Sequence, residues 1–245
     1  MTTAAFQDRA DAGRQLAERL RSMPLTDPLV LALPRGGIDV AWPIAQALHA
    51  ELDVVLARKL RSPSQPELAL GAIREDGEVQ LEPHARHPTE VLKAHIEAEK
   101  KVQRAEIDRA KALYRTVRPQ ATMTGRSVVV VDDGIATGST MIAAMECVRA
   151  QNPCEIVMAT PVAPRDRMPE LRRHCDRAVV LVEASDFATV GSFFGSFAQV
   201  SDDHVVEVLR EHGHQPGETG VDRARLRAAG SGAPARLRSP DGRGR

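Results

Sequence analysis

SVVVVDDGIATGST, residues 127–140, joins an apolar run to two acids and then to a loop of small residues. Four consecutive valines are typical of a strand that is covered on both faces, as in a parallel sheet. A helix is expected from Gly138 to Ala150, directly after the loop. At such a strand-to-helix junction, backbone N–H groups and the positive end of the helix dipole converge on one point, which suits a phosphate.

The acidic pair, Asp132 and Asp133, has a different preference from the loop that follows it. Two carboxylates repel a phosphate, but they accept hydrogen bonds from hydroxyl groups and are good ligands for Mg²⁺. A sugar phosphate presents hydroxyls and a phosphate together. A ribose 5-phosphate would therefore satisfy both halves of the stretch.

Other short apolar runs predict further strands of the same sheet. They lie at residues 29–33, 53–57, 156–159 and 178–182, and helices are expected at 4–22, 38–50 and 166–174. Strands that alternate with helices predict an α/β fold with a central parallel sheet flanked by helices. Ligands of such folds bind at the carboxyl ends of the strands.

An insertion at about residues 60–120 interrupts the alternation. Residues 60–68 look like a mobile loop, and residues 70–82 predict a hairpin that turns at Asp76-Gly77. Residues 89–117 predict a long charged helix with one covered face, on which Val91, Ile96, Val102 and Leu113 are the apolar positions.

The domain is expected to span residues 1–215. Residues 216–245 are rich in Gly, Pro, Ser and Arg and lack apolar periodicity, so they predict a disordered basic tail. No aromatic residues are interleaved with its arginines, which argues against a nucleic-acid partner.

In its order of strand, acid pair, loop and helix, residues 127–140 resemble the signature of the type I phosphoribosyltransferases. The resemblance implies that Asp132 and Asp133 hold the ribose hydroxyls of phosphoribosyl pyrophosphate (PRPP), with Mg²⁺ beside them. It assigns the 5′-phosphate to five loop residues: Ala136, Thr137, Gly138, Ser139 and Thr140. Gly134 departs from the signature, which usually has an apolar residue there. An acidic turn without special function is the alternative interpretation.

Two further features resemble the same family in the expected order. Pro34-Arg35-Gly36-Gly37, after the first apolar run, resembles its pyrophosphate loop, in which Arg35 would supply positive charge and the glycines a close backbone approach. The family often has a non-proline cis peptide there, which would be the Pro34–Arg35 bond. Arg58-Lys59 resembles the basic pair beside the family's flexible loop. Plain strand-end turns remain the alternative for both.

A hood at about residues 184–200 is where such enzymes choose their acceptor. Phe187 resembles the phenylalanine that stacks on the base in 6-oxopurine enzymes, and Phe193 or Phe194 could form a second wall. The acid that those enzymes carry in the phosphate loop is Ala136 here, as in adenine enzymes. Core or interface packing is the alternative role for these aromatic residues, and a purine acceptor is only mildly favoured.

The resemblance covers residues 1 to about 212. It is closest to a little-characterised bacterial subgroup, which shares Phe6-Gln7-Asp8-Arg9 and parts of residues 58–72 and 187–202. By resemblance the protein is expected to be a homodimer.

The composition agrees with this interpretation. Lys+Arg and Asp+Glu number 33 each, which gives no global reason to bind nucleic acid or an anionic membrane. No apolar run is long enough to span a bilayer, and three unpaired cysteines suit a reducing cytoplasm, as buried or inert thiols.

The expected function is transfer of ribose 5-phosphate from PRPP to a nitrogen heterocycle, with Asp132, Asp133, Arg35 and Lys59 as catalytic candidates. Gly36, Gly37, Arg58, the phosphate loop and Phe187 are candidates for substrate binding. The acid pair is the candidate for metal binding. A non-catalytic sensor of PRPP or nucleotides on the same fold is the main alternative. A hydrolase that acts on phosphoribosyl compounds is the third.

Overall fold

The computed structural model describes residues 4–64, 69–82, 85 and 88–212. The predicted basic tail and most of the second half of the predicted 60–68 loop lie outside these residues. Within the described part of the chain, no helix is long and apolar enough to cross a membrane.

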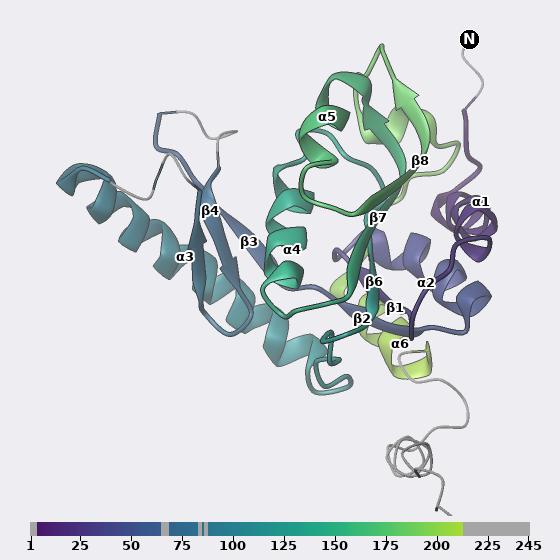
Figure 1. Cartoon of the computed structure of the whole chain (residues 1–245), viewed down its shortest axis with the longest axis horizontal. Helices are drawn as coiled ribbons and strands as arrows, with labels where there is room; N and C mark the ends of the chain where they lie inside the picture. The colour runs from purple at the N-terminus through teal and green to yellow at the C-terminus, as the bar shows by residue number, and fades with distance from the viewer. Residues whose placement is uncertain (1–3, 65–68, 83–84, 86–87, 213–245) are drawn as a thin grey trace, which may run out of the picture. The chain divides into compact units, whose positions relative to one another are not determined.

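A five-stranded parallel sheet forms the centre of the domain (Figure 1). Its strands lie in the order β2 (Glu51–Val54), β1 (Leu29–Ala32), β6 (Ser127–Val131), β7 (Glu155–Pro164) and β8 (Arg177–Ala184). The valines of β6 are fully buried, as a strand covered on both faces requires. Ala32 of β1 is level with Val131 of β6, so the loops after these two strands begin side by side.

Helices cover both faces of this sheet. On one face, α1 (Arg9–Arg21), α2 (Gly37–Leu48) and α6 (Asp202–His212) share a core with the sheet. On the other face lie α4 (Ser139–Arg149) and the short α5 (Met168–Leu171), which follows a 3₁₀ turn at Arg165–Arg167. The predicted α/β class is confirmed.

Several predicted boundaries differ from those in the structure. Helix α1 begins at Arg9 rather than residue 4, because the Asp8 side chain caps it by accepting from the Asp11 N–H. Strand β7 continues to Pro164, five residues beyond the predicted end, because β8 pairs with it as far as Ala184. Helix α6 was not predicted at all.

The predicted strand at residues 53–57 was wrong in its extent. Strand β2 leaves the central sheet after Val54, and a new strand, β3 (Ala57–Arg61), starts in a different sheet. Val55 and Leu56 between them are buried, so their apolar side chains continue the pattern across the break. Arg58 and Lys59 therefore lie within β3 and not at the end of a central strand.

The second sheet is antiparallel and contains β3, β4 (Ala69–Arg74) and β5 (Val79–Leu81). The predicted hairpin turn is confirmed: Gly77 has φ 90°, and Asp76 Oδ1 accepts from the Glu78 N–H at 2.9 Å.

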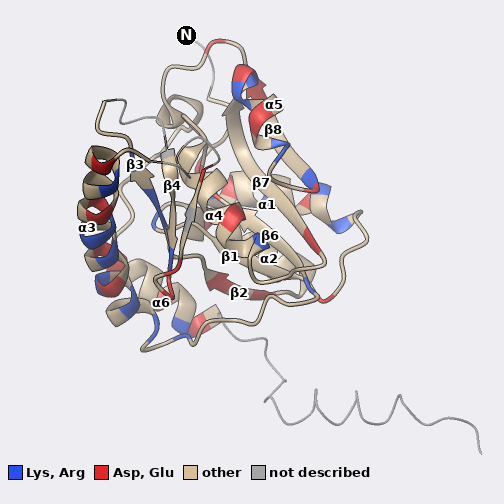
Figure 2. Cartoon of the chain, turned by 60° about the vertical axis from the view of Figure 1, so that its left-hand side comes forward, with Lys and Arg blue, Asp and Glu red and all other residues tan. Residues whose placement is uncertain are grey.

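Helix α3 (Glu90–Tyr114) packs against this second sheet through Ile96 and Ile107. The expectation that Val91 and Val102 would be covered was wrong, since they are 82% and 58% exposed. The rest of the exposed surface of α3 carries charges of both signs, as Figure 2 shows.

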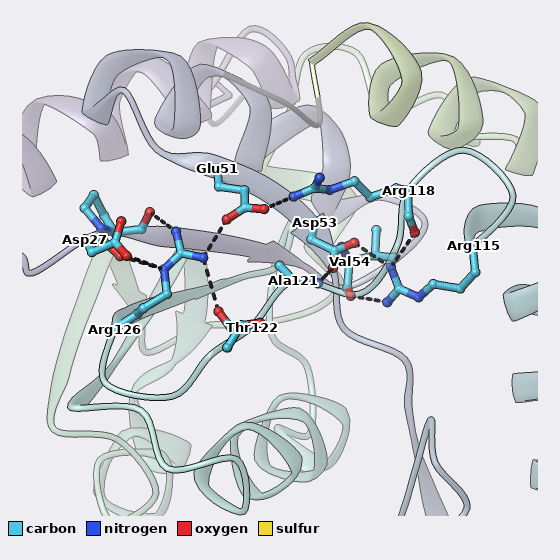
Figure 3. Close-up of polar contacts among 10 residues, drawn as sticks. Asp27, Glu51, Asp53, Val54, Arg115, Arg118, Ala121, Thr122 and Arg126 are labelled. Atoms are coloured by element: carbon cyan, nitrogen blue, oxygen red, sulfur yellow. Dashed lines mark hydrogen bonds and ion pairs between the residues drawn. The ribbon is translucent and has the colours of Figure 1, made fainter. Parts of the chain in front are cut away.

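A buried cluster of charges joins the hairpin and α3 to the central sheet. Arg115, which caps the C-terminus of α3, donates to Asp53 Oδ1 at 2.7 Å and to both carboxylate oxygens of Glu75 at 2.6 and 2.7 Å. Asp53 is fully buried in β2 and also accepts from the Ala121 N–H, as Figure 3 shows. Burial raises the pKa of Asp53 despite the Arg115 charge beside it.

The predicted character of the three cysteines holds in part. Cys147 is buried in α4, and burial raises the pKa of its thiol to about 12. Cys175 is half-buried and Cys154 is exposed, so for Cys154 only the inert half of the expectation stays a prediction.

Candidate active site

The loops that follow β1 and β6 meet at the carboxyl edge of the central sheet. A Cβ atom on Gly37 would lie 2.8 Å from the Val131 carbonyl oxygen, and one on Gly36 would overlap Asp133 Oδ2. Only glycine allows this approach, so Gly36 and Gly37 lie against the acid pair, a contact that the sequence did not predict. The Pro34–Arg35 peptide is cis, also as expected.

The loop after β6 leads into an uncapped helix N-terminus. Gly138 is the N-cap residue of α4 with φ 86°, a conformation that favours glycine, and no side chain in the described part of the chain caps the helix. The first-turn N–H groups and the positive end of the dipole are thus available to an anion. Thr137 Oγ1 and Ser139 Oγ lie 3.0 Å apart at the same place. This arrangement suits a phosphate group.

Negative charge is concentrated immediately beside this anion site. Burial, followed by the neighbouring charge of Asp133, raises the pKa of Asp132 well above its usual value. Asp132 Oδ1 accepts from the Asp133 N–H at 2.9 Å, which restrains the Asp132 carboxylate against the backbone of the next residue. Hydroxyl donors or a cation bound here would relieve the repulsion.

The donor set fits Mg²⁺ only in part. Mg²⁺ commonly takes one or two carboxylates and completes its octahedron with water and substrate oxygens. Asp132 and Asp133 provide such carboxylates. Within the described residues, no cluster of three or more His, Cys, Asp or Glu side chains could hold a metal by itself. The acid pair is therefore suited to a metal that arrives with an anionic substrate.

Lys59 reaches the phosphate loop from the second sheet. Its Nζ donates to Ser139 Oγ at 2.9 Å, across 80 positions of sequence. Arg58 lines a small cavity of about 20 Å³ together with Pro34 and Thr140. Although the strand that carries them was misplaced, the basic pair lies near both loops.

Arg35 forms an ion pair that the sequence did not predict. Its Nη1 lies 3.9 Å from Asp202 Oδ2, at the start of α6. Asp202 also accepts from the Tyr114 hydroxyl at 2.5 Å and from Arg109 at 3.2 Å. Burial and the hydrogen bond to Asp202 raise the pKa of the Tyr114 hydroxyl. Asp202 thus connects the pyrophosphate-type loop, α3 and α6.

The hood, residues 184–200, divides its aromatic residues between two roles. The Phe187 ring stacks on Phe193, with centroids 5.7 Å apart, and both are half-buried. Phe194 is 7% exposed and packs on Phe6, which agrees with the alternative role of core packing and leaves Phe193 as the candidate for the second wall. The role of Phe187 as an acceptor platform stays a prediction.

Gly134, the residue that departs from the family signature, lies under the hood. A Cβ atom there would overlap a methyl group of Val190. The loop after β6 and the hood therefore approach each other more closely than an apolar residue at position 134 would allow.

Comparisons with known proteins identify the family of this chain. The model of the phosphoribosyl transferase domain family matches residues 4–192. A Mycobacterium tuberculosis protein named "Putative phosphoribosyl transferase", found in two strains, is 43% identical over 204 residues, which are 83% of this chain and 46% of that protein. The chain thus spans about half the length of the curated relatives it matches.

A crystal structure of the protein TT1426 from Thermus thermophilus shows the same fold. It is 42% identical, with a TM-score of 0.80, and the match covers 85% of this chain and 99% of that chain.

Proposed function

The chain belongs to the phosphoribosyltransferase family, and from this premise we propose that it transfers the 5-phosphoribosyl group of PRPP to a nitrogen heterocycle. The observation that carries the proposal is the acid pair, which lies between the uncapped N-terminus of α4 and the Gly36-Gly37 loop. PRPP has three parts in the same order. The helix N-terminus suits its 5′-phosphate, the acid pair suits its ribose hydroxyls or a metal, and the Gly36-Gly37 loop suits its pyrophosphate.

Each part of the site has a role in this reaction. The loop from Ala136 to Thr140 binds the 5′-phosphate, and Asp132 with Asp133 binds the ribose hydroxyls. The C1′–O bond to pyrophosphate breaks with its electron pair on the oxygen, and a ring nitrogen forms the C1′–N bond and then loses its proton to solvent. Arg35, Lys59 and the Gly36-Gly37 backbone stabilise the departing pyrophosphate. When bound with PRPP, Mg²⁺ would neutralise part of that negative charge.

Pyrophosphate release from PRPP and Mg²⁺, measured across a panel of nucleobases and small heterocycles, tests the proposal. We expect release that depends on the presence of one class of acceptor. Release without any acceptor would indicate a hydrolase. Tight PRPP binding without release would indicate a non-catalytic sensor, and either result would overturn the proposed activity.

Phe187 is the proposed platform for the acceptor, and Phe187→Ala tests it. Stacking on a base is worth about 1–3 kcal/mol by alanine substitution, so the acceptor KM should rise about tenfold or more. PRPP affinity should stay unchanged, because the phosphate loop is a separate element.

Phe194→Ala is the matched control within the hood. Because Phe194 packs in the core, its loss should cost about 3–5 kcal/mol of stability and appear as a fall in melting temperature. If Phe187→Ala behaves like this control, or leaves the acceptor KM unchanged, Phe187 is not the platform.

A further inference from the structure

Arg9, the first residue of α1, makes contacts that no part of the proposed function uses. It is 8% exposed, although a cation at a helix N-terminus is disfavoured by the helix dipole. Its Nε donates to Asp133 Oδ2 at 2.7 Å, and its Nη1 donates to the Ala198 carbonyl oxygen at 2.7 Å. Its guanidinium carbon also lies 3.7 Å from the centre of the Phe197 ring. Tertiary contacts thus hold this charge where local helix preference opposes it.

The contact with Asp133 restrains the carboxylate from one side. Gly36, in the neighbouring loop, limits it from another, because even a Cβ atom at position 36 would overlap Asp133 Oδ2. Oδ2 is thus held between the Arg9 guanidinium and the Gly36 backbone. The orientation of the carboxylate is fixed before any ligand arrives, which reduces the ordering cost of binding.

The chain segment before Arg9 forms backbone hydrogen bonds with the hood. The Phe6 N–H donates to the Phe193 carbonyl oxygen, and the Gly195 and Ser196 N–H groups donate to the carbonyl oxygens of Phe6 and Gln7. Arg9 continues this pairing by its bond to Ala198. The same side chain therefore joins the hood to the acid pair.

The geometry points to Arg9 as a positioning residue that fixes Asp133 for the ribose hydroxyls and fastens the hood to the acid pair. This inference rests on the proposed function, since it needs Asp133 to bind ribose. A guanidinium is required, because its edge donates in two directions while its face covers the Phe197 ring. A lysine ammonium is a point charge and cannot make all three contacts.

Titration calorimetry with ribose 5-phosphate and with inorganic phosphate tests this role. The two probes distinguish the loss of Asp133 positioning from a disturbance of the whole site. Both probes use the phosphate loop, but only ribose 5-phosphate uses the acid pair. In Arg9→Gln, the affinity for ribose 5-phosphate should fall about tenfold or more, the scale of a lost charge-assisted contact. The affinity for inorganic phosphate should change less than about twofold. Arg9→Lys should fall between wild type and Arg9→Gln.

Arg14→Gln is the matched control, because Arg14 lies on the same helix and its side chain is 60% exposed. It should bind both probes as the wild type does. If Arg9→Gln binds ribose 5-phosphate like this control, or loses both probes equally while still folded, the inference is overturned. If Arg9→Gln does not fold, the same criteria apply to Arg9→Lys. A wild-type protein that binds ribose 5-phosphate no better than phosphate would overturn the proposed function itself, and this inference with it.

Discussion

An Arg115→Met variant is expected to lose about 3–5 kcal/mol of its free energy of unfolding. The substitution keeps an extended apolar stem but leaves Asp53, which is fully buried, and Glu75, whose side chain is 9% exposed, without their shared cation. An uncompensated buried carboxylate is costly because it cannot recover its hydration. Denaturant unfolding followed by circular dichroism measures the loss.

Lys93→Met is the control on the same helix, because Lys93 is exposed and its ion pair with Glu90 lies at the surface. It should change stability by less than about 1 kcal/mol. An Arg115→Met variant as stable as this control would show that the buried cluster does not hold the second sheet to the domain.

The pH dependence of Arg115→Met follows from Asp53. Burial already raises its folded pKa above the unfolded value, and loss of the Arg115 charge raises it further. The folded state then binds the proton more tightly, so stability falls as pH rises from the unfolded pKa through the folded pKa. The deficit relative to wild type should therefore be smaller at acid pH than at pH 8. A deficit that grows on acidification would contradict this assignment.

Gly36→Ala is expected to lower kcat/KM for PRPP about a hundredfold, because misplacement of catalytic groups by about 1 Å has effects of this size. The backbone at residue 36 has φ −61° and ψ −32°, which alanine adopts readily. The obstacle is Asp133, which must move to admit the methyl group. Steady-state kinetics with a melting curve on the same protein should show lost activity with little lost stability.

Gly125→Ala should show the opposite pattern. Gly125 has φ 73°, and a Cβ atom there would meet no described atom within 4 Å. The substitution should cost about 1–2 kcal/mol of stability through backbone strain and leave kcat/KM intact. Equal changes in kcat/KM in the two variants would contradict the proposal that Gly36 is needed for the position of Asp133.

The central sheet and the main loop could be predicted because they depend on local pattern. The valines of β6 are buried on both faces, and Asp132 to Thr140 is one continuous segment whose chemistry can be read directly. The break between β2 and β3 could not be predicted in this way. Buried Val55 and Leu56 continue the apolar run although the chain changes sheets.

Contacts between distant segments could not be predicted from the sequence. Arg9 meets Asp133 across 124 positions, and Arg115 meets Asp53 across 62. Charged residues at helix ends are usually solvated, so nothing local distinguishes these two arginines from the others. The start of α6 carried a usable signal that was missed: Asp202 and Asp203 precede Val205, Val208 and Leu209 at helical spacing.

Titration calorimetry of PRPP with Mg²⁺ against wild type, Asp132→Asn and Asp133→Asn tests the central claim most directly. Both substitutions keep the shape of the side chain but remove its charge. Each should weaken PRPP binding by at least about 1.5 kcal/mol, more than tenfold, as expected for a lost charge-assisted hydrogen bond. Asp166→Asn, a change at a residue whose side chain is 77% exposed, should leave the affinity unchanged. Unchanged PRPP affinity in both Asp132→Asn and Asp133→Asn would contradict the assignment of the acid pair to ribose.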